Sequence, residues 1–195
     1  ASASLPPVFP PTAVDGAETI TVPRVGAIYV APPAVQANTA VEYYHADFGH
    51  YFVTSGTSEI GDLDAGKHRG WARTGQAFKV FPLGTAGTSN VCRFFSEAYA
   101  PRSSHFYTPY GFECDLRRQD PSWSFEGEVF GYRLPDASGD CPAGTVQLFR
   151  FYNNGADGAP NHRFTTDLQV RSQMIAEGWI PEGLGPLVVS ACVPQ

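Results

Sequence analysis

The chain has 195 residues, of which 43% are hydrophobic and only 16% are charged, with a net charge of −6. This balance excludes disorder driven by self-repulsion over most of the chain, and it disfavours a general nucleic-acid binder, which needs a basic face. The sequence holds 20 Gly, 17 Pro and 13% aromatic residues but a single Met, a composition typical of a mainly β protein with short strands. It has no stretch of 18 consecutive apolar residues, so we expect no membrane-spanning helix.

Residues 1–40 differ from the rest of the chain because they hold seven of the 17 prolines and few charges. Three Pro-Pro pairs, the first at residues 6–7, favour an extended polyproline-type chain. Two short runs between them, residues 19–22 and 26–30, have the composition of strands. We predict an extended arm that packs on the domain or on a partner; a linker to a neighbouring segment is the alternative.

From residue 41 the sequence repeats, in units of about residues 41–90, 91–145 and 146–195. Each unit opens with an aromatic run, at residues 41–44, 92–95 and 149–152. Each continues with a run of histidine and aromatic residues, which begins at His50, His105 and His162. Each then has the motif Gly/Ser-Trp-x-x-Thr/Glu-Gly, with its tryptophan at Trp71, Trp123 and Trp179. The chain has three tryptophans and all fall in one slot, so we predict three structural repeats.

Within each unit the aromatic run predicts a first strand and the histidine run a second. A threonine at its end then caps a short helix: Pro109 suits a first helical position, and Thr166 with Gln169 forms a capping box. The tryptophan segment predicts a third strand, and residues 78–81 or 130–132 a fourth. One such sheet cannot bury both faces, whereas three can around a shared axis. We therefore predict a mainly β, pseudo-threefold assembly of three ββαββ-like repeats, similar to a small propeller; a β-trefoil is the alternative, which the helix in each unit disfavours.

These motifs resemble a repeat family known from secreted bacterial and fungal proteins, a domain of unknown function often appended to exported hydrolases. The resemblance covers about residues 41–193, and the third unit, with residues 149–153 and 179–183, matches best. The first unit departs most, with Val53, Thr74 and a shorter loop before His50. The resemblance implies export and a non-catalytic accessory role at a surface or a glycan, and it carries no catalytic residues.

The four cysteines, Cys92, Cys114, Cys141 and Cys192, contain no CxxC spacing, so zinc and thioredoxin-like motifs are unsupported. An even cysteine count with few lysines fits an exported protein, secreted, periplasmic or on the cell surface, whose signal peptide has been removed. Four reduced cysteines in a cytosolic protein are the alternative. We expect disulfides within units, Cys92–Cys114 and Cys141–Cys192.

The repeated histidines, His50, His105 and His162, are the first candidates for binding. Three imidazoles could hold a metal ion only if they converged, and we expect each to stay in its own unit. We expect each ring to bond a backbone carbonyl or the glutamate of its tryptophan motif, with contact to a glycan or small ligand as the alternative. Tyr99, Tyr110 and Phe112, aromatic residues outside the repeat pattern, are further ligand-binding candidates. No cofactor or metal is expected.

The remaining candidates are expected to be structural. Trp71, Trp123 and Trp179 anchor the core of their units, although tryptophan also stacks on sugars. Glu126 and Glu182 could hydrolyse a glycoside only if their carboxyl groups lay about 5–9 Å apart. A pairing with Arg93 and Arg150, which share one slot of the repeat, is more natural.

The sequence lacks the motifs of serine hydrolases, P-loop proteins and zinc peptidases. We therefore expect a secreted, non-enzymatic binding or assembly module that recognises a cell-surface polymer, a glycan or a protein partner. Two alternatives are a small exported glycan hydrolase and a structural subunit that self-assembles through residues 1–40.

Overall fold

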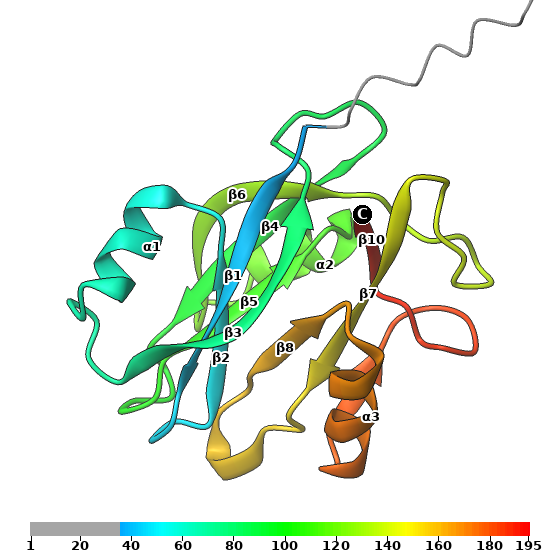
Figure 1. Ribbon diagram of the computed structural model, residues 1–195. Coiled ribbons are helices and arrows are strands. Elements are labelled where there is room, and N and C mark those ends of the chain that lie inside the picture. The colour runs from blue at the N-terminus through cyan, green and yellow to red at the C-terminus, as the bar shows by residue number, and fades with distance from the viewer. Residues whose placement is uncertain (1–35) are drawn as a thin grey trace, which may run out of the picture. The chain divides into compact units, whose positions relative to one another are not determined.

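A computed structural model describes residues 36–195, which form a mainly β fold of three antiparallel sheets and three short α-helices (Figure 1). Residues 1–35, with most of the predicted arm and its two candidate strands, lie outside the described residues. Residues 38–40, expected in the arm, instead belong to the first strand. No helix among residues 36–195 combines the length and the apolar composition that crossing a membrane requires.

Each sheet carries one helix, and we call a sheet with its helix a unit. Unit one contains β1 (Asn38–His45), β2 (His50–Thr54), α1 (Thr57–Asp64) and β3 (Trp71–Val80). Unit two contains β4 (Ser89–Ser96), β5 (Ser104–Thr108), α2 (Gly111–Arg118) and β6 (Ser124–Tyr132). Unit three contains β7 (Thr145–Tyr152), a 3-10 turn (Ala156–Gly158), β8 (His162–Thr165), α3 (Leu168–Ala176), β9 (Ile180–Glu182) and β10 (Ala191–Pro194).

The three units share one order of elements. In each, the first strand lies between the second strand and the strand that follows the helix. The threonine that ends the second strand is paired with the same position of the first strand, as Val41 with Thr54, Cys92 with Thr108 and Phe149 with Thr165. The hydroxyl oxygen of each threonine accepts a backbone N–H bond from the residue two positions later, at 3.0 to 3.1 Å. This local turn directs the chain into the helix.

The predicted helix starts are wrong by a few residues. α2 begins at Gly111, so Pro109 precedes the helix instead of occupying its first position. α3 is capped by Asp167, whose carboxylate accepts bonds from the N–H groups of Gln169 and Val170 at 2.7 and 3.3 Å, and not by Thr166. Thr165 already accepts the backbone N–H bond of the turn before α3, and the next side chain suited to cap the helix is that of Asp167.

The predicted third and fourth strands of units one and two are single strands. Residues 78–80 continue β3, residues 130–132 continue β6, and both strands pair with the first strand of their unit through a shift in register. In unit three the two parts remain separate as β9 and β10, which both pair with β7. The loop 183–190 separates them, so the strands of this unit alone match the predicted ββαββ order.

One hydrophobic core draws on all three sheets. Val53 of unit one, Tyr107 of unit two and Phe164 of unit three belong to the same buried cluster, and the hydroxyl of Tyr107 donates to the carbonyl of Val53 at 2.7 Å. Short bridges also join the sheets, from Phe81 to Gly131 and from Arg133 to Cys192. Each sheet therefore buries its apolar face against residues of the other two.

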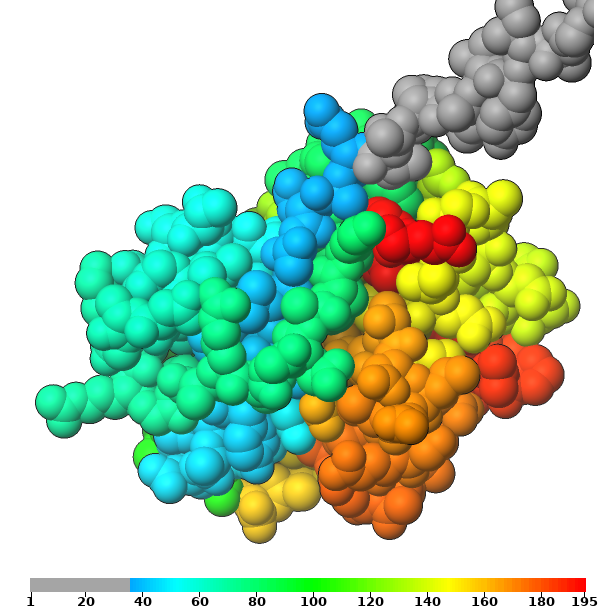
Figure 2. Space-filling view, in the orientation of Figure 1, coloured from blue at the N-terminus to red at the C-terminus, as the bar shows by residue number. Residues whose placement is uncertain are grey.

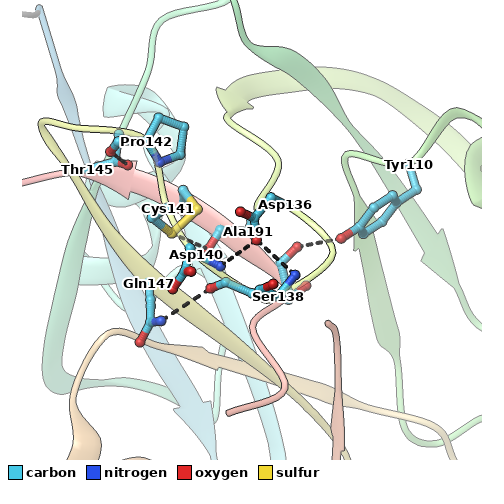
Figure 3. Close-up of a disulfide and its surroundings, with 12 residues drawn as sticks. Tyr110, Asp136, Ser138, Asp140, Cys141, Pro142, Thr145, Gln147 and Ala191 are labelled. Atoms are coloured by element: carbon cyan, nitrogen blue, oxygen red, sulfur yellow. Dashed lines mark hydrogen bonds between the residues drawn. A yellow bond between two sulfur atoms is a disulfide. The ribbon is translucent and has the colours of Figure 1, made fainter. Parts of the chain in front are cut away.

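Two disulfides join Cys92 to Cys114 and Cys141 to Cys192, the partners preferred from the sequence. The second fixes β10 to the turn that precedes β7, where Asp136 accepts N–H bonds from Ser138 and Asp140 (Figure 3). The C-terminal residues, red in the space-filling view, lie between the end of β3 and the yellow residues of β7 (Figure 2).

Two glycine substitutions test how the loop 183–190 packs on the turn that precedes β7. Gly49 and Gly185 have nearly the same φ, +68° and +67°. A Cβ at Gly185 would lie 1.9 Å from the carbonyl oxygen of Ser138, whereas a Cβ at Gly49 would have no atom within 4 Å. We expect Gly49→Ala to cost about 1–2 kcal/mol, the penalty of a left-handed backbone, and Gly185→Ala to cost about 1–3 kcal/mol more. Urea unfolding of both variants measures the difference, and equal losses would contradict the close contact at Gly185.

Candidate functional site

A groove of about 670 Å³ lies at the junction of units two and three, and we call it the large groove. Unit two lines it with residues of β5, α2 and the loops on either side, and unit three lines it with residues of β7, β8 and β9. Its central side chains are Phe106, Glu113, Trp123, Arg150, His162 and Glu182. The groove therefore exists only where two units meet.

Arg150 holds the two walls of the large groove together. Its Nη1 and Nη2 lie 2.9 and 3.0 Å from the carboxylate oxygens of Glu113, on α2 of the neighbouring unit. Its Nε lies 2.8 Å from Oε2 of Glu182 in its own unit, and Nε2 of His162 lies 3.2 Å from the same oxygen. Two carboxylates from different units thus share one guanidinium, whose side chain is only 7% exposed.

The charges of the large groove are fixed by this network. Burial opposes ionisation of both Glu113 and Glu182, but their partners outweigh it and lower both pKa values: chiefly Arg150 for Glu113, and His162 with Arg150 for Glu182. Burial lowers the pKa of His162, which favours the neutral ring at neutral pH. The lining also includes Arg117, whose guanidinium pairs with Asp120 at 2.9 Å, so the lining residues themselves hold two carboxylates and two guanidinium groups.

Four buried polar atoms of the large groove lack a hydrogen bond among residues 36–195. Two of them, Nε of Arg150 and Oε2 of Glu182, form an ion pair with each other at 2.8 Å, which leaves Nε1 of Trp123, a residue only 7% exposed, and Nδ1 of His162 without any partner. At the rim, by contrast, apolar side chains are open to solvent, since Phe112 is 71% and Leu116 66% exposed. The arrangement combines exposed apolar faces with unused hydrogen-bonding atoms, as ligand sites do.

A second groove of about 280 Å³, the small groove, lies at the junction of units one and two. Its lining includes Phe52, Glu59, Trp71, His105 and Glu126. Arg93 again joins the two units: its Nη1 lies 2.9 Å from Glu59 Oε2 on α1, and its Nε lies 2.9 Å from Glu126 Oε2. His105 lies beside the same glutamate, at 3.6 Å.

The junction of units three and one uses the same kind of ion pair with its charges exchanged. Glu42 occupies the slot of Arg93 and Arg150, and its carboxylate binds Arg163 on β8 through two contacts of 3.0 Å. Thr74, in the slot of the two motif glutamates, donates its hydroxyl to Glu42 at 2.7 Å. Both members of the pair are buried, with side chains 1% and 9% exposed.

Strand register corrects the alignment of the histidines. His105 and His162 are paired with Phe95 and Tyr152, which share one slot, but the corresponding residue of unit one is Tyr51. His50 instead faces His45 and has its Nδ1 2.7 Å from the carbonyl oxygen of Ser103. The equivalence of His50 with the other two histidines is therefore wrong: the strands align on their terminal threonines, one residue away from the spacing that the histidines suggest.

The other predicted residues divide between groove and core. Tyr99 and Phe112 line the large groove, whereas Tyr110 donates its hydroxyl to the carbonyl of Ser190 outside it. Trp123 packs against the disulfide-containing core of unit two, while Trp71 and Trp179 are partly buried. Arg93 lies against Glu126 and Arg150 against Glu182, the pairs expected from the sequence.

Sequence reasoning missed Glu59, Glu113 and Arg163, which join the units. A signal for the two glutamates was present, because each follows the threonine of its second strand by five residues. No three His, Cys, Asp or Glu side chains within the described part of the chain are grouped so that they could hold a metal ion.

A family model described as a domain of unknown function, DUF5648, matches residues 39–189. The chain belongs to this family. The match covers all three units of this DUF5648 domain except the last strand, β10. No curated protein and no solved structure matches the chain.

Unfolding at different pH values tests the buried histidine of the small groove. Burial, helped by the charge of Arg93, lowers the pKa of His105 to about 3, so the folded protein binds fewer protons than the unfolded chain. The contribution of the neutral His105 ring to the free energy of unfolding is complete above about pH 6.5. It is lost as the pH falls toward the pKa of His105 in the folded protein, and the loss at pH 5 is about 2 kcal/mol. Glu126, whose pKa is raised by burial, acts in the opposite sense near its own titration range.

We expect the loss of unfolding free energy between pH 7.5 and 5 to be about 2 kcal/mol smaller in His105→Phe than in the wild type. The control is His68→Gln, because His68 is exposed at the rim of the same groove. Urea titrations at both pH values measure the effect, and an unchanged pH dependence in His105→Phe would show that this ring is not buried as a neutral group.

Proposed function

We propose that this DUF5648 domain is an exported, non-catalytic binding module that holds a neutral polysaccharide in its large groove. The observation that carries the proposal is the lining of that groove, in which open apolar side chains surround buried polar atoms without partners. A sugar ring presents both matching features, since its C–H faces stack on aromatic rings while its hydroxyl groups donate and accept hydrogen bonds.

The charge of the groove supports a neutral ligand. The carboxylates of Glu113 and Glu182 and the guanidinium groups of Arg117 and Arg150 balance one another, so a strongly anionic or cationic ligand finds no excess of opposite charge. The indole N–H of Trp123 is a buried donor without a partner among residues 36–195. Of the neutral chains, β-1,4-linked polysaccharides suit the site best, because their equatorial bonds leave flat apolar faces.

The same contacts support binding in preference to hydrolysis. A glycosidase needs one carboxyl group that stays protonated to serve as the general acid. Both carboxylates of the large groove instead face Arg150, which favours their ionised forms, and Arg150 also fixes their positions. They are therefore suited to accept hydrogen bonds from sugar hydroxyls.

Export is supported by the two disulfides, since such bonds persist in oxidising compartments. The pseudo-threefold arrangement is supported by the ion pairs at the unit junctions. Glu59 of unit one faces Arg93 of unit two, Glu113 of unit two faces Arg150 of unit three, and Arg163 of unit three faces Glu42 of unit one. These contacts pass once around the three units and return to the first, as a propeller-like closure requires.

A pull-down on insoluble polysaccharides, followed by calorimetry with soluble fragments, tests the proposed function. We expect retention on a neutral β-1,4-linked chain and a two- to tenfold loss of affinity in Phe112→Ala, about the value of one aromatic stacking contact. The matched control is Leu168→Ala, because Leu168 is also an exposed apolar residue of a helix, 60% accessible, but lies outside the groove. Equal binding by both variants would exclude the large groove as the site, and no retention on any neutral chain would refute the proposal.

A further inference from the structure

We infer that the small groove is a second binding site for the same class of neutral saccharide, so that the domain binds a polysaccharide at two points. This inference rests on the proposed function. It is carried by the correspondence between the two grooves, which are built from equivalent positions of successive units.

The wall supplied by the earlier unit corresponds residue by residue. Phe52 of the small groove and Phe106 of the large groove are paired with the same position of their first strands, opposite Tyr43 and Phe94. Glu59 and Glu113 both lie on the helix and bind an arginine of the next unit. A tryptophan completes each wall, Trp71 in the small groove and Trp123 in the large groove.

The wall supplied by the later unit corresponds as well. His105 in the small groove and His162 in the large groove each lie against a glutamate of the third strand, Glu126 or Glu182. An aromatic side chain lies beside each histidine, with ring centroids 5.0 Å apart for Phe95 and His105 and 5.1 Å apart for Tyr152 and His162. Both grooves thus offer aromatic rings that can stack on a sugar beside a histidine and a carboxylate that can bind its hydroxyl groups.

The small groove differs in size and at one position of the helix. Its volume is about 280 Å³, compared with about 670 Å³ for the large groove. Leu63 stands where the large groove has Arg117, whose guanidinium lies 5.0 Å from the ring centroid of Trp123. The small groove therefore suits fewer sugar rings and a more apolar face of the chain.

The third junction is filled by side chains of the protein itself. Arg163 stands in the slot of Phe52 and Phe106, and its Nη1 lies 3.2 Å from Sδ of the fully buried Met174. Tyr51, in the slot of the two histidines, packs edge-on against Trp179 with ring centroids 5.8 Å apart. Two sites rather than three follow from this exchange of side chains.

The three tryptophans make the inference directly testable, because one lies at each junction. In a ¹H–¹⁵N spectrum the three indole N–H signals, assigned with single Trp→Phe variants, report separately on the small groove (Trp71), the large groove (Trp123) and the third junction (Trp179). The probes are trisaccharides of β-1,4-linked glucose and of β-1,4-linked N-acetylglucosamine, titrated into the intact protein.

We expect the signals of Trp71 and Trp123 to shift with saturation, each with its own dissociation constant, while that of Trp179 stays in place. A shift of Trp123 alone would overturn the second site and leave the proposed function intact. No shift of any indole signal would refute both proposals, and equal shifts of all three would overturn the two-site inference, because they would indicate a change of the whole fold.

Two variants separate the grooves. Ser103→Phe adds bulk to the lining of the small groove, and we expect it to abolish the saturable Trp71 shift while the Trp123 shift is retained. Phe112→Ala should weaken the Trp123 titration two- to tenfold and leave that of Trp71 unchanged. His68→Ala, a milder change at the rim of the small groove, provides a second measurement should the larger side chain perturb folding. Loss of both titrations in His68→Ala would contradict independent sites.

Discussion

Glu42→Gln is expected to lower the free energy of unfolding by about 3–5 kcal/mol, the usual cost of removing one partner from a buried ion pair. The carboxylate of Glu42 is the charge that faces Arg163, and both side chains are buried at the junction of units three and one. Without it the guanidinium of Arg163 stays in the interior without its paired carboxylate. Urea unfolding at neutral pH measures the loss.

The matched control is Glu59→Gln at the junction of units one and two. The side chain of Glu59 is 33% exposed, and its partner Arg93 keeps Glu126 as a second carboxylate, so we expect a loss of about 1 kcal/mol or less. The double variant Glu42→Met with Arg163→Met should recover much of the stability, because it removes both buried charges. Equal losses for Glu42→Gln and Glu59→Gln would show that burial does not distinguish the two junctions.

Replacing both Cys141 and Cys192 with serine is expected to cost about 4 kcal/mol. This disulfide spans 51 residues, and the chain-entropy relation assigns roughly that value to a loop of such length. The loss should also free β10 from the turn before β7, where the disulfide holds it. Thermal and urea unfolding of the double variant measure the effect.

The control is the double serine variant of Cys92 and Cys114, whose bridge spans 22 residues and should cost about 3 kcal/mol by the same relation. Limited proteolysis gives a second readout: we expect cleavage near residues 183–190 to increase only when the longer loop is opened. An unchanged melting temperature in the Cys141 and Cys192 variant would mean that β10 is held by its strand pairing alone.

The order of elements within a unit was predictable because it depends on local patterns. Aromatic runs formed the central strands β1, β4 and β7, and threonines marked the ends of the second strands. The sequence could not reveal the length of the strand that follows the helix, β3 or β6. Nothing near Phe78 or Phe130 shows whether this strand continues unbroken past the shift in register with β1 or β4. That outcome depends on pairing with β1 and β4, which are distant in sequence.

The candidate site was predictable only within single units. The pairing of Arg150 with Glu182 lies between neighbouring strands and followed from their shared repeat positions. The contact of Arg150 with Glu113 joins two units, and no spacing in the sequence fixes how units are placed. The histidine alignment failed for a related reason, because residue type suggested His50 as the equivalent position whereas strand register places Tyr51 there.

The pairing of each cysteine with the next one along the chain bears on how the protein matures. In the export proposed above, the polypeptide enters an oxidising compartment amino end first, so Cys92 meets Cys114 before either later thiol has arrived, and Cys141 then waits for Cys192. An enzyme that merely joins thiols in order of arrival thus yields the native set. Production of this protein should accordingly require an oxidase and little help from disulfide shuffling.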